Sequence, residues 1–242
     1  MSFGDTKFVP SVPPSVFESI VRAGGSARAT DLLVGIMDKI YSLSSGELQL
    51  AMPGSGVTAY YSSNVTKDDV DCVQRWITSS LPADSSYNTR IFKSSDGTMQ
   101  LRVAAANFRD GGKQTFEGRE IHLIYGDPAF VPFLKAAAEY IDAAKPHAAN
   151  ENQLEMLTKY SEHFRNGDIT LHKASQVAWV KDVGPAVECN LGFIESYRDP
   201  VGVRGEWEGF VAVVNKTMSE KFGGLVDAAS SLLAQVPCPL VH

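Results

Sequence analysis

Ionisable side chains crowd into one short stretch, residues 192–210, which reads GFIESYRDPVGVRGEWEGF. It holds three glutamates, an aspartate, a tyrosine and two arginines around an Asp-Pro-Val-Gly turn signal. Alternate residues of an extended strand share a face, so Phe193, Glu195 and Tyr197 are predicted to point the same way. Two carboxyls in partly apolar surroundings push the pKa of one of them upward, and a carboxyl that stays protonated near neutral pH is a general acid.

The pairing across this hairpin decides which groups meet. With the turn midway along the stretch, Glu195 is predicted to lie opposite Glu208, and Tyr197 opposite Glu206; a slip of one residue would move the set to the other face. We predict Glu195, Tyr197 and Glu208 as catalytic residues. The predicted substrate-binding residues are Trp179, Phe193, Glu206 and Trp207. A simpler alternative stays open, above all for Glu206 and Asp199, because charged residues on hairpins commonly form a solvated face.

Other catalytic signatures are missing from the 242 residues. The five histidines form no His-Glu-x-x-His pair, and there is neither a Cys-x-x-Cys pair nor a Gly-x-Ser-x-Gly nucleophile turn. Cys72, Cys189 and Cys238 are far apart in the sequence, which is typical of a reducing compartment and of small buried side chains. We predict no metal ion and no cofactor.

The overall composition narrows the setting. Hydrophobic residues make up 44% of the chain and charged residues 21%, as in ordinary globular proteins. A net charge of −6 and a pI near 5.4 argue against nucleic acid as a partner. No apolar run is long enough to cross a membrane, and the first residues lack the basic start and apolar centre of a signal peptide. We predict a cytoplasmic protein that binds neither nucleic acid nor a membrane.

Strand and helix patterns occur in separate blocks along the chain. Alternating apolar residues predict strands at 56–62, 88–93, 99–106 and 119–125, a Gly-rich loop at 109–113, and the hairpin described above. Helical spacing predicts a short helix capped by Ser15, a helix capped by Thr66, and helices at 30–44, 130–144, 152–165, 169–180 and 219–236. The segregation indicates an α+β fold, with a small antiparallel sheet or a partly closed β-barrel flanked by helices. No linker or repeat divides the chain, so residues 1–242 are predicted to form a single domain.

Several segments carry a family resemblance over nearly the whole chain. They are SFGDTKFVP at 2–10, YNTRIFK at 87–93, HAAN at 147–150, KDVGP at 181–185, GFIESYRDP at 192–200 and RGEWEGFVAVVNK at 204–216. The chain resembles the β-barrel lobe of the dipeptidyl peptidase III family, zinc-dependent exopeptidases of eukaryotic cytosol. The resemblance implies that Glu195 matches the glutamate that holds the substrate's amino terminus. It likewise implies that Tyr197 matches the tyrosine that assists the transition state.

The chain departs from this family where the zinc should be held. The family's His-Glu-x-x-x-His and Glu-Glu-Cys-x-x-(Glu/Asp) motifs do not occur in the sequence, so we expect a truncated member without the zinc lobe and without peptidase activity. The chain is also similar to truncated fungal relatives in quinolone alkaloid pathways, which act as Brønsted acids on epoxides. This resemblance predicts a metal-independent isomerase or cyclase of secondary metabolism that donates a proton to an epoxide-type small molecule.

A second function stays open, that of a catalytically inactive module that binds peptides or a protein partner. The enzyme hypothesis predicts a small-molecule substrate and a closed apolar pocket with a buried carboxyl at Glu195 or Glu208. The binding hypothesis predicts an open groove or a large exposed apolar patch. Because such a patch calls for a partner, a homodimer is also predicted as a candidate assembly.

Overall fold

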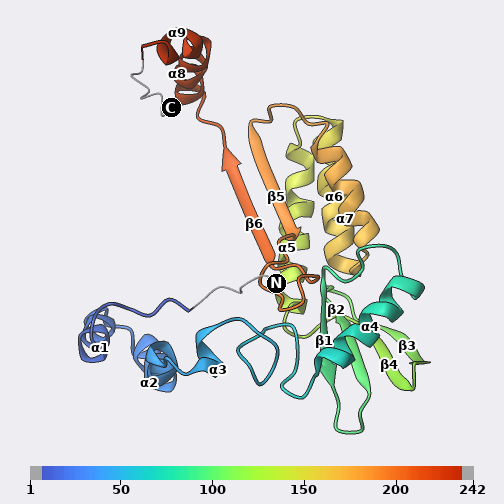
Figure 1. Ribbon diagram of the computed structural model, residues 1–242. Helices are drawn as coiled ribbons and strands as arrows, with labels where there is room; N and C mark the ends of the chain where they lie inside the picture. The colour runs from blue at the N-terminus through green and yellow to red at the C-terminus, as the bar shows by residue number, and fades with distance from the viewer. Residues whose placement is uncertain (1–6, 236–242) are drawn as a thin grey trace, which may run out of the picture.

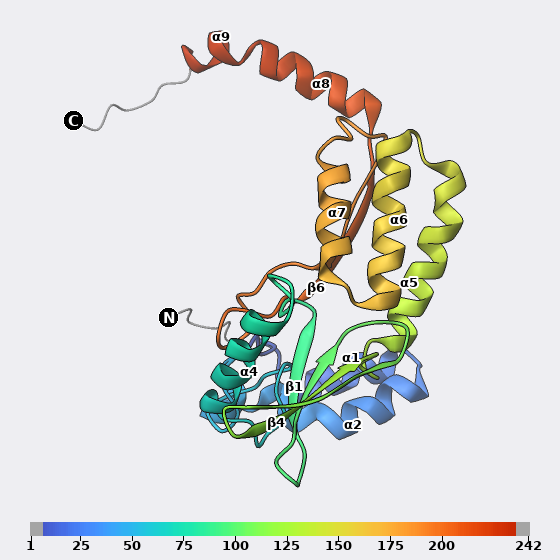
Figure 2. The same ribbon diagram turned by 90° about the vertical axis from the view of Figure 1, so that its right-hand side faces the viewer.

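A computed structural model describes residues 7–235 of the chain (Figure 1). The helices are α1 (Pro14–Ala23), α2 (Ala27–Tyr41), α3 (Ser45–Leu48), α4 (Lys67–Ser80), α5 (Val131–Ala144), the 3-10 helix η1 (Lys145–His147), α6 (Glu151–Asn166), α7 (Ile169–Trp179), α8 (Lys216–Asp227) and α9 (Ala229–Leu233). The strands are β1 (Thr89–Lys93), β2 (Met99–Val103), β3 (Arg109–Phe116), β4 (Arg119–Tyr125), β5 (Val187–Phe193) and β6 (Trp207–Val213). They form two separate sheets, and α5, α6 and α7 stand beside the second one (Figure 2).

The first sheet has four strands in the order β1-β2-β4-β3. Strands β1 and β2 are antiparallel and confirm the predicted hairpin, whereas β2 and β4 are parallel. In the turn between β1 and β2, Gly97 takes a φ of 88°, a left-handed conformation that favours a residue without a Cβ. Asp96 Oδ1 closes the turn by accepting from Thr98 N at 3.0 Å.

The loop predicted at residues 109–113 is wrong, because these residues belong to strand β3. The Gly-rich segment pairs with β4 and contains a β-bulge between Asp110 and Gly112. Gly112 adopts a φ of 86°, and its amide donates to Asp110 Oδ1 at 2.8 Å. The glycines indicated a loop, but in the structure Gly112 forms a β-bulge inside a strand.

Helix α4 covers the first sheet with its apolar face. Thr66 caps the helix as predicted: Thr66 Oγ1 accepts from Asp69 N at 3.2 Å, and Asp69 Oδ2 accepts from Thr66 N at 3.0 Å. The buried core between helix and sheet includes Val70, Val73, Trp76, Ile77, Ile91, Leu101 and Ile121. Burial of each large apolar side chain contributes about 1.5–3 kcal/mol, so this cluster is a main source of stability for the first sheet.

Two predictions in the N-terminal part of the chain are wrong. The strand predicted at 56–62 forms only isolated bridges, one of which joins Tyr61 to Ile91 of β1. Ser15 lies inside α1 and does not cap it, because the helix already begins at the preceding proline. The next predicted helix is confirmed as α2, which begins three residues early because Ser26 caps it.

Helices α5, α6 and α7 confirm the three predicted helices to within one residue at each end. Helix α6 ends at Gly167, which has a φ of 72° and donates its amide to His163 O at 2.7 Å. The core between these helices and the hairpin includes Leu134, Ala138, Met156, Leu157, Tyr160, Phe164, Cys189 and Phe193. This cluster joins the second sheet to the helices.

The described residues form a mixed α+β fold, which confirms the predicted class. Within residues 7–235 the sheets of four and two strands do not close into a barrel. Helices α8 and α9 extend beyond the end of β6, away from the rest of the protein in both views (Figure 1, Figure 2). They replace the single helix predicted at 219–236, whose last residue lies outside the described range. No helix among the described residues is long and apolar enough to cross a membrane.

Candidate functional site

The hairpin pairs in a different register from the predicted one. Phe193 lies opposite Trp207, and Glu208 lies opposite Gly192 instead of Glu195, three residues away. A shift of the register by an odd number of residues turns a side chain to the other face of the sheet. Glu208 therefore points to the face opposite to the one that holds Phe193 and Trp207. The predicted meeting of Glu195 and Glu208 is therefore wrong, since a long irregular loop separates the strands where a short turn was assumed.

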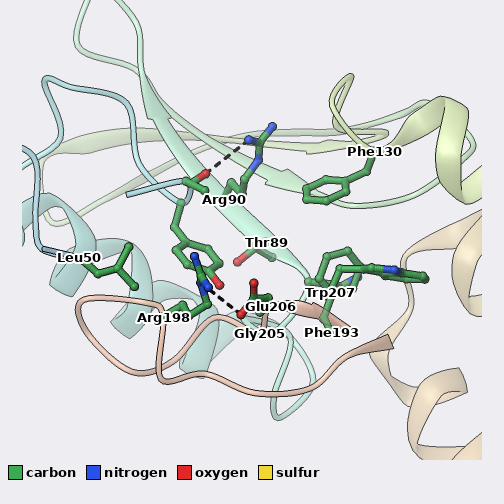
Figure 3. A pocket seen from close by; sticks show the side chains of 12 residues that line it. Leu50, Thr89, Arg90, Phe130, Phe193, Arg198, Gly205, Glu206 and Trp207 are labelled. Atoms are coloured by element: carbon green, nitrogen blue, oxygen red, sulfur yellow. Dashed lines mark hydrogen bonds and ion pairs between the residues drawn. The ribbon is translucent and has the colours of Figure 1, made fainter. Parts of the chain in front are cut away.

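A cavity of about 260 Å³ lies where the hairpin loop meets the first sheet. Residues from segments far apart in the sequence line it, among them Tyr60, Arg90, Phe130, Phe193, Glu206 and Trp207. Figure 3 shows Phe130, Phe193 and Trp207 gathered on one side, with Arg198 and Glu206 beside them on the hairpin loop. The cavity is therefore a product of the tertiary fold.

Three aromatic rings form an apolar wall of this cavity. The ring centroids of Phe130 and Phe193 are 5.2 Å apart at 85°, and those of Phe193 and Trp207 are 5.3 Å apart at 73°. Both pairs have the edge-to-face geometry that aromatic rings favour. Trp207 also contacts Phe164 of α6, at 5.1 Å between centroids, so the helical core holds the wall in place.

Two arginines at the cavity differ in how firmly they are held. Arg90 donates to both carboxylate oxygens of Asp127 at 2.6 Å, and the aspartate is almost fully buried. Arg198 pairs with Glu206 at 3.2 Å, and both side chains are partly exposed, 44% for the arginine and 34% for the glutamate. An exposed pair contributes about 0–1 kcal/mol, so a ligand can replace Arg198 as the partner of Glu206 at small cost.

Uncharged polar residues also line the cavity, among them Tyr60 and Asn88. Burial, and then the negative charges of Glu206 and Asp199, raise the pKa of Tyr60 to about 12, so its phenol stays protonated. Asn88 is buried and donates from Nδ2 to Gly167 O at 2.9 Å, while its Oδ1 has no hydrogen-bond partner among residues 7–235. An unpaired buried acceptor is unfavourable by about 1–3 kcal/mol, and this oxygen is too deeply buried for a ligand in the cavity to reach.

The structure brings together only some of the predicted site residues. Phe193, Glu206 and Trp207 line the cavity. Glu195 and Tyr197 lie on the same loop, where both are exposed and neither is part of the lining. The loop backbone nevertheless keeps the two glutamates close, because Glu206 N donates to Glu195 O at 2.8 Å.

The other two predicted residues lie away from the cavity. Glu208 is half-buried on β6, and its Oε1 has no hydrogen-bond partner in the described part of the chain. Trp179, the last residue of α7, donates from Nε1 to Glu188 Oε1 at 2.7 Å and lines a separate hollow. Neither residue shares the lining of the cavity.

Sequence reasoning missed several residues of the site. Tyr60, Arg90 and Phe130 carry no local signal of a site, because only the tertiary fold brings them to the hairpin loop. Asp199, for which a solvated position was the simpler prediction, is 1% exposed and accepts backbone amides of its own loop. The signal that could have found it is the Asp-Pro-Val-Gly turn, since aspartate side chains often bind amides two or more residues on. Arg198 pairs with the carboxylate of Glu206, which agrees with the simplest expectation for this arginine.

The zinc that the family resemblance implies does not fit the described residues. No three side chains of His, Cys, Asp or Glu among residues 7–235 lie close enough together to hold a metal ion. The nearest approach to a histidine pair is His163 and His172, whose ring centroids are 5.3 Å apart, and His163 Nδ1 is already bonded to Asp168 O at 2.8 Å. No step through a metal ion is therefore derived.

Comparison with known proteins assigns the chain to a family. The model of peptidase family M49 matches residues 32–241. The chain belongs to peptidase family M49. It is 42% identical over 238 residues to dipeptidyl peptidase 3 of Dictyostelium discoideum and 38% identical over 257 residues to that of Homo sapiens. Each match covers 98% of this M49 chain and 34% of the relative, so the chain spans about a third of the length of the curated relatives it matches.

Two solved structures also align with the M49 chain. Dipeptidyl-peptidase III from Corallococcus sp. strain EGB covers 90% of this chain and 37% of its own, with 17% identity and a TM-score of 0.49. DPP III from Caldithrix abyssi covers 95% of this chain and 40% of its own, with 16% identity and the same TM-score. The family assignment rests on the sequence matches and not on these alignments.

The family corrects the predicted function. The relatives of the M49 chain are named as dipeptidyl peptidases, so the predicted isomerase or cyclase acting on an epoxide is wrong, as is its setting in fungal alkaloid metabolism. The geometry agrees to the extent that neither Glu195, which is exposed, nor Glu208 is part of the lining of the cavity. The predicted small-molecule substrate is wrong for the same reason, and the predicted homodimer has no support.

Proposed function

We propose that this M49 chain binds the amino-terminal end of short peptides in the cavity beside the hairpin loop. The proposal takes up the peptide-binding alternative, and it is supported by relatives whose name, dipeptidyl peptidase, describes enzymes that act on peptides. One observation carries it. The carboxylate of Glu206 lies at the rim of an aromatic-walled cavity, partly exposed and paired with the partly exposed Arg198.

The charge of a peptide's amino terminus suits this carboxylate. An ammonium group that replaces Arg198 forms a charge-assisted hydrogen bond with Glu206, and such bonds contribute about 1.5–3 kcal/mol. The protonated phenol of Tyr60 offers a donor for a peptide carbonyl.

The aromatic wall selects the first side chain of the peptide. Phe130, Phe193 and Trp207 present an apolar surface, so an apolar or aromatic first residue binds better than a charged one. The volume of about 260 Å³ is just below the roughly 300–1,000 Å³ of sites that enclose a whole drug-sized ligand. The cavity therefore suits the end of a peptide, while the rest of the peptide extends over the loop.

The other predicted residues take secondary places in this proposal. Glu195 and Tyr197, exposed on the same loop, contact the peptide beyond its first residue. For Glu195 this differs from what the resemblance implies, since the proposal gives the amino terminus to Glu206. Trp179 contacts only a ligand long enough to reach the end of α7. Proton transfer by Glu195, Tyr197 or Glu208 is no part of the proposal, because that role belonged to the epoxide chemistry.

Binding, and not cleavage, is what we assign to the described residues, since no step of cleavage follows from their geometry. Residues 1–242 act as one domain in this binding. The buried free thiols of Cys72 and Cys189 suit a reducing compartment, which supports a cytoplasmic location.

Isothermal titration calorimetry tests the proposal with a tetrapeptide that begins with phenylalanine and its N-acetylated form. We expect the free peptide to bind at least about tenfold more tightly, a difference of 1.4 kcal/mol. Glu206→Gln should remove most of this difference, whereas Glu220→Gln, a matched change on the exposed helix α8, should leave it intact. Equal affinity for the two peptides, or an unaltered difference in Glu206→Gln, would contradict the proposal.

A further inference from the structure

The end of the hairpin loop is held by successive backbone amides. Val203 N and Arg204 N donate to Asp199 Oδ2 at 3.0 and 2.9 Å, and Val201 N donates to Asp199 Oδ1 at 3.2 Å. Glu206 N then donates to Glu195 O at 2.8 Å. One side chain, that of Asp199, thus organises the main chain that leads to Glu206.

Gly205 completes this series of bonded amides and joins the loop to the segment that leads into β1. Its amide donates to Tyr87 O at 2.8 Å, two residues before β1. A Cβ at this position would come within 2.7 Å of the main-chain carbon of Phe193, so only glycine fits. The main chain from Val203 to Glu206 is therefore fixed at every amide.

Tyr61 anchors Asp199 to the rest of the protein. Its buried hydroxyl donates to Asp199 Oδ1, and Arg204 Nη1 donates to the same hydroxyl at 3.2 Å and lies 3.7 Å from Asp199 Oδ2. Burial raises the pKa of Tyr61, so the phenol keeps the proton that it donates. The segment of Tyr61 is joined to β1, because Ser62 N donates to Ile91 O at 3.1 Å and Ile91 N donates to Tyr60 O at 2.8 Å.

We infer that Asp199, held by Tyr61 and Arg204, is a positioning residue that sets Glu206 and Arg198 at the rim of the peptide cavity. This inference rests on the proposed function. Arg198 directly precedes Asp199 in the chain, and Glu206 follows the amides that Asp199 and its neighbours bind. Tyr60, the neighbour of Tyr61 in the chain, lines the cavity. Tyr60 thus supplies part of the cavity wall, while Tyr61 anchors Asp199.

Two variants test the inference, with hydrogen exchange and peptide titration as readouts. Asp199→Asn removes the charge, and Tyr61→Phe removes one hydroxyl while the ring still fills its place. In both we expect faster exchange at the amides of Val201, Val203 and Arg204, with β1 and β2 unchanged. We also expect free peptide to bind about tenfold more weakly, and the ratio of free to acetylated affinity to fall toward one.

The matched control is Asp96→Asn. Asp96 also accepts an amide in a turn, that of Thr98, but it lies in the β1–β2 hairpin and outside the cavity lining. It should leave peptide affinity and the affinity ratio unchanged.

The outcomes separate the two proposals. Loss of affinity for both peptides alike, with the ratio preserved, overturns the positioning role, as does unchanged exchange at the three loop amides. Should Asp199→Asn fail to fold, Tyr61→Phe decides the question alone. A wild-type chain that binds neither peptide overturns the proposed function and this inference with it, whereas normal binding by Tyr61→Phe overturns the inference only.

Discussion

The first sheet and the β5–β6 hairpin differ in what holds them together. In the first sheet, Ile91, Leu101 and Ile121 are fully buried beneath α4, which directly precedes β1 in the chain. The hairpin has two strands, and its outer strand leaves Phe210 and Val213 exposed, at 51% and 75%. A two-stranded hairpin is at best marginally stable by itself in water. The hairpin therefore depends on α5, α6 and α7 and on the contacts of its loop with the first sheet.

This difference explains why the candidate site lies where it does. The first sheet supplies a fixed wall, in which Arg90 is locked by Asp127. The hairpin loop supplies the exposed pair of Arg198 and Glu206, which a ligand can rearrange. Binding residues on a loop that a rigid scaffold positions are a common arrangement in proteins. Three measurements test whether the two regions differ in this way.

The largest expected effect is in the core of the first sheet. Trp76 is a buried residue of α4 that packs against the first sheet, so Trp76→Ala should lower the free energy of unfolding by about 3–5 kcal/mol. Phe210→Ala, on the exposed face of β6, should change it by about 1 kcal/mol or less. Urea denaturation measures both. Similar losses in the two variants would mean that the hairpin is as well buried as the sheet.

Acid should loosen the hairpin region before the first sheet. His163 of α6 is buried, and this burial lowers its pKa to about 4, against about 6.5 in an unfolded chain. The unfolded state then binds the proton more readily. The free energy of unfolding should fall as the pH drops from 6.5 toward 4, by about 3 kcal/mol in all. Burial lowers the pKa of His172 too, which acts in the same direction.

Hydrogen exchange at pH 7 and pH 4.5 resolves this effect by region. We expect β5 and β6 to lose protection at pH 4.5 while β1 and β2 keep it. His163→Gln should remove most of the difference between the two pH values. Equal loss of protection in both sheets would contradict the expected order.

The smallest effect concerns the contact of the hairpin with α7. A Cβ added at Gly192 would lie 2.7 Å from Cε1 of His172, so Gly192→Ala should destabilise the protein by about 1–3 kcal/mol through overpacking. The second change His172→Ala should recover part of that loss, because it removes the clashing ring. Gly223→Ala on α8, where a Cβ meets nothing within 4 Å, is the control and should not destabilise. Thermal unfolding of Gly192→Ala, His172→Ala, the double variant and the control measures the coupling between Gly192 and His172. Additive losses in the double variant would show that the His172 ring does not limit the space at Gly192.

Local patterns predicted much of the fold because they depend on neighbouring residues. The helical spacing of Val70, Val73 and Trp76 and the cap at Thr66 predicted α4, and alternating apolar residues predicted β1 and β2. The prediction failed where glycines served a strand, as at Gly112 of β3, because a bulge and a loop need the same residue.

The site was predictable only in part. Phe193, Glu206 and Trp207 were named from one stretch of sequence and do line one cavity. The register of that stretch was not predictable, because it depends on how many residues the loop between the strands takes up. Arg90 and Phe130, which complete the cavity, lie 60 or more residues before the hairpin loop, so no local pattern connects them to it.

The periodic elements, the α+β class and the long motifs of peptidase family M49 could be recognised from the order of residues alone. Each of these features depends on neighbouring residues in the chain, so each can be predicted before the contacts between distant segments are known. In contrast, the position of Glu208 outside the cavity and the burial of Asp199 became visible in the folded protein. Strand register and burial follow from contacts between segments far apart in the chain, such as that of Tyr61 with Asp199, and local spacing does not encode them.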